Sequence, residues 1–252
     1  MRGGNGKKRD GAQRFRDGVQ RLRTGTERSV AYHGLLVARV CAGEWYNPAV
    51  SGIFFTFEGP DGAGKTTQIG RLETALAERG YETLRTREPG GDFVGEQVRQ
   101  LLLDRSAMTR EAEFLLFAAS RAQNVAQVVR PALEAGKVVL CDRFTDSSLA
   151  YQGFARGLDL EFLRAANTFA TCGLTPHKTF LLDVPVEIGK ARRSTGETNR
   201  LDREAEAFHQ RVRDGYLAVA AAEPGRFVVL DGTQPEDVVF AQLWAAVQAL
   251  LP

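Results

Sequence analysis

From residue 53 onward, short apolar runs alternate with longer amphipathic stretches, and this alternation limits the fold more than any other feature. The apolar runs are IFFTFE, ETLRT, KVVLC, KTFLL and RFVVL, which begin at residues 53, 82, 137, 178 and 226. Helices are expected near 65–79, 93–104, 110–127, 159–171, 185–193, 203–222 and 235–250. This order predicts an α/β fold in three layers, with a five-stranded parallel sheet between two layers of helices.

Each apolar run ends in a polar or glycine-rich turn. The turns are GPDGAGK, REPGG, DRF, DVP and DGTQP. Because the carboxyl ends of parallel strands share one edge of a sheet, and ligands bind outside that edge, the five turns predict one shared site.

The turn after the first strand carries the most specific signal. In FEGPDGAGKTTQ (57–68), Gly59, Gly64, Lys65 and Thr66 match G-x-x-x-x-G-K-[ST] between an expected strand and an expected helix. Backbone N–H groups of such a loop surround phosphate oxygens, the lysine reaches the β- and γ-phosphates, and the hydroxyl binds Mg²⁺. We therefore expect ATP with Mg²⁺ at this loop. The residues expected to hold it are Gly59, Pro60, Asp61, Gly62, Ala63, Gly64, Lys65, Thr66 and Thr67.

Four further segments add to this loop, namely TREPGG (86–91), LLFAASRAQNV (115–125), CDRFTDSSLAYQGFARG (141–157) and RLDREAEAFHQRVRDGY (200–216). Together the five segments closely resemble the thymidylate kinases, which pass the γ-phosphate of ATP to dTMP. The resemblance runs from about Ile53 to the C-terminus. It implies a P-loop NTPase fold over 51–252, a mobile lid near 190–204, and a homodimer.

The resemblance also implies a pocket for thymine. Phe117 and Arg121 are four residues apart on one helical face. Phe117 would stack on the base and Arg121 would donate to thymine O4, although spacing alone also fits a core Phe and a surface Arg. Ser148, Tyr151 and Gln152 follow i, i+3, i+4 spacing; Ser148 and Gln152 offer acceptors for thymine N3–H, and Tyr151 would pack beside C2′ of the sugar. The alternative for this segment is an ordinary capped helix with a half-buried Tyr.

A second group of residues is expected at the dTMP phosphate. Arg143 would grip the 5′-phosphate with two hydrogen bonds, and Asp142 would either hold a Mg²⁺-bound water or orient Arg143. Asp61 matches the acidic position that meets the 3′-hydroxyl in the family. Phe144 stands where Tyr or His is more usual after the Asp-Arg pair, which leaves the chemistry unchanged.

The segment after the second strand resembles the family's remaining substrate contacts. Arg87 and Arg99 match contacts to the acceptor phosphate and nucleoside, while Glu88 and Pro89 shape the same wall. For Arg99, a solvated helix face is the alternative. Asp92 replaces the small residue that the family usually has there.

The phosphate loop contains no arginine, so the catalytic arginine is expected from the lid. In KARRSTGETNRLDRE (190–204), Arg200 aligns best with the family's lid arginine, and Arg192, Arg193 and Arg203 are candidates to support it. Such a residue contributes roughly 10³–10⁵ in rate. The alternative is a solvated basic loop.

The net charge of +2 hides an uneven distribution. Residues 1–52 contain 10 Lys/Arg and 4 Asp/Glu, which leaves 23 basic and 27 acidic residues in the body. Residues 1–50 are therefore expected to be a basic, disordered extension, with a nucleic-acid arm as the less favoured alternative. The three cysteines and the lack of a membrane-length apolar run fit a cytoplasmic protein.

Two other functions remain open on the sequence. One is a kinase for a different nucleoside monophosphate, because the phosphate loop does not identify the acceptor. The other is a non-enzymatic nucleotide-binding module whose basic arm contacts nucleic acid. Release of ADP that depends on dTMP separates both from a thymidylate kinase.

The basic segment is predicted to be dispensable. Val50 leads directly into the first strand, and a GTG codon there would serve as an initiator. A variant that begins at Val50 should keep the activity of the full chain in an assay of ADP release. Loss of activity in this variant would contradict the prediction.

Overall fold

The computed structural model of this chain describes residues 51–104, 106–192 and 200–251. The expected extension (1–50) and the centre of the expected lid (193–199), including Arg193, lie outside the described residues. Within the described part, no helix is long and apolar enough to cross a membrane.

The sheet has five parallel strands, as expected. They are β1 (Ile53–Glu58), β2 (Thr83–Arg87), β3 (Val138–Asp142), β4 (Lys178–Asp183) and β5 (Phe227–Asp231). Their order across the sheet is β2-β3-β1-β4-β5, and every neighbouring pair is parallel. Three strands begin and end one residue later than expected. The central strand β1 is buried from Phe54 to Glu58, as a parallel strand covered on both faces must be.

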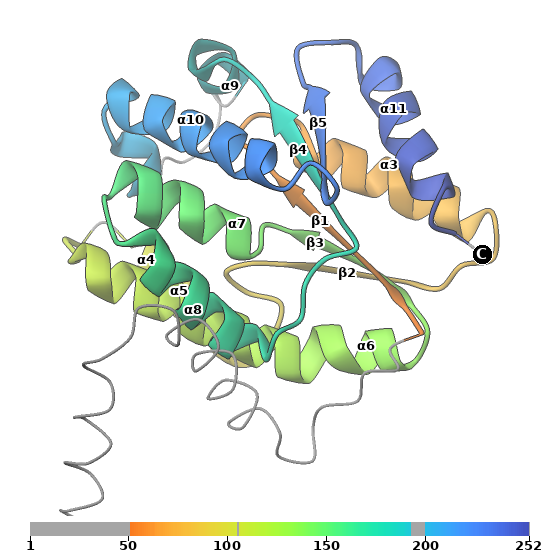
Figure 1. Cartoon of the computed structure of the whole chain (residues 1–252), viewed down its shortest axis with the longest axis horizontal. Helices are drawn as coiled ribbons and strands as arrows, with labels where there is room; N and C mark the ends of the chain where they lie inside the picture. Colours follow the sequence, from red (N-terminus) through yellow and green to blue (C-terminus); the bar gives the residue numbers. More distant parts are fainter. Residues whose placement is uncertain (1–50, 105, 193–199, 252) are drawn as a thin grey trace, which may run out of the picture. The chain divides into compact units, whose positions relative to one another are not determined.

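Helices cover both faces of the sheet, which confirms the three-layer architecture (Figure 1). On one face lie α3 (Lys65–Ala77) and α11 (Glu236–Gln248), and their apolar residues pack with Phe55 and Phe57 in one core cluster. The opposite face carries α6 (Arg130–Glu134), which packs around Phe54. The alternation of side chains along β1 sends these phenylalanines into separate cores.

The second layer continues with α4 (Phe93–Leu103), α5 (Arg110–Asn124), α7 (Thr145–Ser148), α8 (Leu160–Thr171) and α10 (Glu206–Ala222). A further helix, α9 (Val186–Arg192), follows β4 and contacts α10. A third core cluster joins α5, α8 and α10 with the segment that follows α7. The figure shows α10 running beside α7 on this side of the sheet (Figure 1).

Two helical segments differ from expectation. The helix expected over 110–127 continues to Glu134 through a π-helical turn at Val125–Val129, and a second π-helical stretch, Leu149–Ala155, extends α7. In the second stretch Arg156 N donates to Tyr151 O, five residues earlier. A π-turn is wider than an α-turn, so the helical spacing assumed for Ser148, Tyr151 and Gln152 does not describe their neighbours. Ser148 contacts Arg121, Gln152 contacts Glu113, and Tyr151 packs against Phe208 and Tyr216.

Candidate active site

A cavity of about 510 Å³ lies at the carboxyl edge of the sheet. Its walls come from the loop after β1, the start of α3, the ends of β2 and β3, and the turn after β5. The pairing of β1 with β3 sets this arrangement, because Phe57 lies opposite Asp142 and Arg143 N donates to Phe57 O at 2.9 Å. The loop after β1 and the Asp-Arg pair after β3 therefore leave the sheet side by side.

The loop after β1 has the conformation that its glycines predict. Gly59 has φ 131°, and a Cβ there would lie 2.3 Å from Leu182 O, so another side chain is excluded. Gly64, with φ 94°, directly precedes α3. Lys65 Nζ donates to Gly59 O and Pro60 O, both at 3.1 Å. Burial lowers the pKa of Lys65 and Arg143 adds to this, while nearby carboxylates act against it.

The backbone of Arg143 is strained. Its φ of 69° lies in the left-handed region, which costs a non-glycine residue about 1–3 kcal/mol. The guanidinium donates to Asp61 Oδ1 at 2.7 Å and to Tyr216 OH at 2.8 Å, and it lies 5.2 Å from the Tyr151 ring centroid. Asp61, rather than Asp142, is thus the carboxylate that orients Arg143.

Asp142 has a different environment. Its Oδ1 atom is buried and has no hydrogen-bond partner among the described residues. It lines the same cavity as the exposed Thr66. In the described part of the chain, no three His, Cys, Asp or Glu residues gather as a metal site. Mg²⁺ is typically held by one or two protein oxygens plus substrate phosphates, so Asp142 and Thr66 fit this ion.

The segment after β2 forms the next wall of the cavity. Arg87, Glu88 and Arg99 line it. Arg87 Nη2 donates to both carboxylate oxygens of Glu96, at 2.9 and 3.0 Å, and Arg99 Nη1 donates to Pro89 O at 3.0 Å. Arg99 is therefore tied to the site and does not belong to a purely solvated helix face.

The unusual Asp92 has a structural role at this wall. It is the N-cap of α4, and its Oδ1 accepts a hydrogen bond from Gly95 N at 3.0 Å. Asp is one of the preferred N-cap residues, so this departure from the family pattern supports the helix that carries Arg99.

Arg121 is buried, which rules out the surface alternative for this residue. Only 1% of it is exposed, and Nε donates to Glu88 Oε2 at 2.7 Å. Nη1 donates to Ser148 Oγ at 2.9 Å and Asn167 Oδ1 at 2.6 Å, and Nη2 donates to Phe144 O at 2.9 Å. These bonds use four of its five N–H groups, which leaves one for a base.

Glu88 links this buried arginine to the cavity. Burial raises the pKa of Glu88, and the charge of Arg121 opposes that shift. Glu88 N also donates to Asp142 O at 2.9 Å. The backbone and side chain of Glu88 thus connect the phosphate end of the site to Arg121 and Ser148.

The other residues expected at the base lie outside the wall of the described cavity. Phe117 is half-buried, one helical turn before Arg121. Gln152 Nε2 donates to Glu113 Oε1 at 2.8 Å, and Tyr151 packs edge-on against Phe208 and Tyr216. The structure therefore groups the phosphate residues around one cavity. It links two of the base residues to them, Arg121 through Glu88 and Phe144 O, and Tyr151 through its ring contact with Arg143.

The expected lid arginines occupy different places. Arg200 Nη1 lies 2.7 Å from Glu113 Oε2, and Nε donates to Leu102 O at 3.3 Å, so Arg200 does not line the cavity. Arg192 does line the cavity, and its Nη1 donates to Gly232 O at 2.8 Å. Arg203 is exposed.

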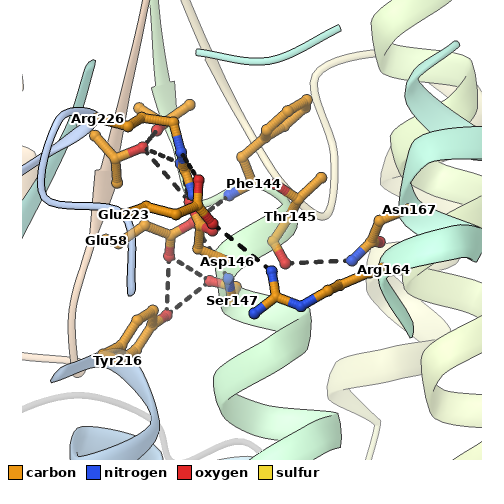
Figure 2. A network of polar contacts seen from close by, with 12 residues as sticks. Glu58, Phe144, Thr145, Asp146, Ser147, Arg164, Asn167, Tyr216, Glu223 and Arg226 are labelled. Atoms are coloured by element: carbon orange, nitrogen blue, oxygen red, sulfur yellow. Dashed lines mark hydrogen bonds and ion pairs between the residues drawn. The ribbon is translucent and has the colours of Figure 1, made fainter. Parts of the chain in front are cut away.

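Three residues linked to Arg143 were not anticipated from the sequence, namely Glu58, Ser147 and Tyr216. Ser147 and Tyr216 accept hydrogen bonds from the Arg143 guanidinium. Both also donate to Glu58 (Figure 2). Burial raises the pKa of Glu58 to about 7, Asp146 adds to the shift, and Arg143 opposes it. A signal was present, since Glu58 is the one charged residue in the run IFFTFE and is the last before the phosphate loop.

Comparison with known proteins identifies the family. The family model described as thymidylate kinase matches residues 57–243. Thymidylate kinases from Desulfovibrio desulfuricans and Deinococcus radiodurans are each 52% identical, over 211 and 198 residues; the matches cover 79% and 78% of this chain and 96% of each relative. The crystal structure of thymidylate kinase from Ehrlichia chaffeensis matches with a TM-score of 0.67 and 32% identity, covering 78% of this chain and 99% of that one. The chain therefore belongs to the thymidylate kinase family.

Proposed function

We propose that this chain transfers the γ-phosphoryl group of ATP to dTMP, forming ADP and dTDP. The observation that carries the proposal is the shared cavity, in which Lys65 and Thr66 of the phosphate loop face the same space as Asp142 and Arg143. A donor phosphate at the loop and an acceptor phosphate at Arg143 would then meet at the carboxyl edge of the sheet. Phosphoryl transfer depends mainly on such positioning and on charge stabilisation.

On the donor side, Lys65 provides the positive charge. It donates to the backbone carbonyls of Gly59 and Pro60, which a phosphate oxygen can replace, and its Nζ lies 3.9 Å from Asp61 Oδ1. Thr66 and Asp142 would hold Mg²⁺, which supplies charge neutralisation at the phosphates when it is bound. No general base is required, because the attacking group is an ionised phosphate.

On the acceptor side, Arg143 would bind the 5′-phosphate of dTMP, with Arg87 and Arg99 on the neighbouring wall. Asp61 already fixes one edge of the Arg143 guanidinium, which reduces the entropy lost when a phosphate binds. Asp61 would contact the 3′-hydroxyl of dTMP and keep its bond to Arg143, because a carboxylate accepts several hydrogen bonds.

At the base, Phe117 would stack on thymine and the remaining N–H of Arg121 would donate to O4. Cytosine presents an amino group at that position, so a cytosine nucleotide would leave two donors opposed. An unpaired buried donor costs about 1–3 kcal/mol, which corresponds to discrimination of about tenfold to a hundredfold. The buried network around Arg121 supports this role because it holds the guanidinium in one orientation.

We also propose that the protein is a cytoplasmic homodimer. Leu115 of α5 and Phe162 and Phe169 of α8 are 58%, 54% and 56% exposed, although large apolar side chains usually avoid water. A second copy packing on these helices would cover them. Cys141 and Cys172 are free thiols, as is usual in a reducing compartment.

A nucleotide panel tests the proposed function. With ATP and Mg²⁺, ADP release should depend on dTMP and be at least about tenfold slower, as kcat/KM, with dCMP, because of the donor conflict at Arg121. The panel should also contain dUMP, dGMP and UMP. A faster rate with another monophosphate, or ADP release independent of any acceptor, would refute the proposal.

The lid arginine is tested by separate substitutions. Arg200 is bound to Glu113 in this structure, so the proposed role requires its guanidinium to leave Glu113 and reach the phosphates. Arg200→Ala is then expected to lower kcat far more than it raises KM for dTMP, by roughly 10³-fold, because such a residue stabilises charge on the transferring phosphoryl group. Arg79→Ala, at an exposed position outside the cavity wall, serves as the control. If Arg200→Ala changes only KM, Arg200 serves substrate binding and not catalysis. If Arg192→Ala loses more kcat than Arg200→Ala, the catalytic arginine is Arg192, which lines the cavity.

A further inference from the structure

Glu58 is fully buried at the end of β1, and each of its carboxylate oxygens accepts two hydrogen bonds (Figure 2). Oε1 accepts from Phe144 N at 2.7 Å and Ser147 N at 3.3 Å. Oε2 accepts from Ser147 Oγ at 2.6 Å and Tyr216 OH at 2.9 Å. All four partners are donors, so an ionised carboxylate is the form of this side chain that satisfies all of them.

The same two hydroxyl groups contact Arg143. Arg143 Nη1 donates to Tyr216 OH at 2.8 Å and to Ser147 Oγ at 3.3 Å. A hydroxyl has one hydrogen and two lone pairs. Ser147 Oγ and Tyr216 OH also lie 2.8 Å apart, where either could donate to the other. When both give their hydrogens to Glu58 instead, the lone pairs of both oxygens accept from Arg143 Nη1, which is within hydrogen-bond distance of each.

We propose that Glu58 is a positioning residue for Arg143. By taking the hydrogens of Ser147 and Tyr216, its carboxylate orients their lone pairs toward Arg143 and fixes the guanidinium. With Asp61 on the other side, three of the five N–H groups are used, which leaves two for the phosphate of a nucleoside monophosphate. This inference rests on the proposed function, because it concerns how the acceptor phosphate is held.

The alternative is that Glu58 only stabilises the start of α7, and the chain contains a matched control for it. Asp146 lies on the same turn and is 1% exposed. It accepts from Arg226 Nη1 and Nη2, at 2.7 and 2.8 Å (Figure 2). Asp146 therefore supports the same turn of helix, but no hydrogen bond joins it to Arg143, Ser147 or Tyr216 in the described structure.

The isosteric substitution Glu58→Gln separates these roles. An amide places an NH₂ group where one oxygen stood. If that group faces Ser147 and Tyr216, their hydrogens turn toward Arg143 and oppose its N–H groups. If it faces the backbone, it opposes Phe144 N and Ser147 N instead. In both arrangements the support of Arg143 is weakened.

The test compares the affinities of the full-length protein for dTMP and for thymidine, measured by calorimetry. Thymidine lacks the phosphate that Arg143 would bind. Glu58→Gln should weaken dTMP binding about tenfold and leave thymidine binding unchanged. In an Arg143→Ala background, Glu58→Gln should cause no further loss of dTMP affinity, because the effects of substitutions at interacting residues are not additive. Asp146→Asn should lower the melting temperature while keeping the ratio of the two affinities.

Each other outcome overturns the inference. Glu58 would be only a structural support in any of three cases. The first is an unchanged ratio of dTMP to thymidine affinity in Glu58→Gln, and the second is an equal loss of affinity for both ligands. The third is that Glu58→Gln weakens dTMP binding as much in the Arg143→Ala background as in the wild-type protein. If Glu58→Gln does not fold, Tyr216→Phe removes one acceptor of Arg143 and should lower the same ratio. A wild-type protein without dTMP-dependent ADP release would instead refute the proposed function, and with it the basis of this inference.

Discussion

The parallel pairing of β1 with β3 is the constraint on which the rest of the site depends. It sets Phe57 opposite Asp142, so that the phosphate loop and the Asp-Arg pair leave the sheet at the same level. Two bonds fasten the turn that follows: Arg143 N donates to Phe57 O, and Phe144 N donates to Glu58. The strained backbone of Arg143 is held between these contacts. A shift of one residue in this register would reverse the faces of all the side chains of β3.

Keeping an ionised carboxylate at Glu58 reduces the stability of the fold. Burial raises its pKa from 4.5 to about 7, so the folded state binds a proton more tightly than the unfolded state does. The contribution of this group to the free energy of unfolding is therefore most favourable below about pH 4.5 and is lost as the pH rises through about 7. Functional sites often reduce the stability of a fold in this way, and here the destabilised carboxylate belongs to the group that orients a substrate-binding arginine.

The sequence predicted the layers of the fold and the chemistry of the rim, because both follow from local patterns. Apolar runs of strand length and the glycine spacing of the phosphate loop are readable without any long-range contact. The partners of Arg121 were not readable, because Glu88, Ser148 and Asn167 come from three separate segments. The π-helical turn after α7 was missed for a related reason: an inserted residue leaves helical composition unchanged but rotates the side chains that follow it.

Glu58 and Tyr216 illustrate the same limit. A single carboxylate at the end of an apolar strand was visible in the sequence, but its partners are 89 and 158 residues away along the chain. The expected catalytic position of Arg200 also depended on long-range contacts, because the structure places its guanidinium beside Glu113 of α5. Local patterns thus specify which chemical groups reach the rim, while packing between distant segments decides what each group contacts.

The central claim is that donor and acceptor phosphates meet in the cavity between the phosphate loop and Arg143. A crystal structure with ADP, Mg²⁺ and dTMP tests it most directly. The account predicts the β-phosphate of ADP against Lys65 and the backbone of residues 59–67, the dTMP phosphate against Arg143, and thymine against Phe117. Binding of dTMP anywhere else, for example in the cavity beside Arg164 and Arg226, would contradict it.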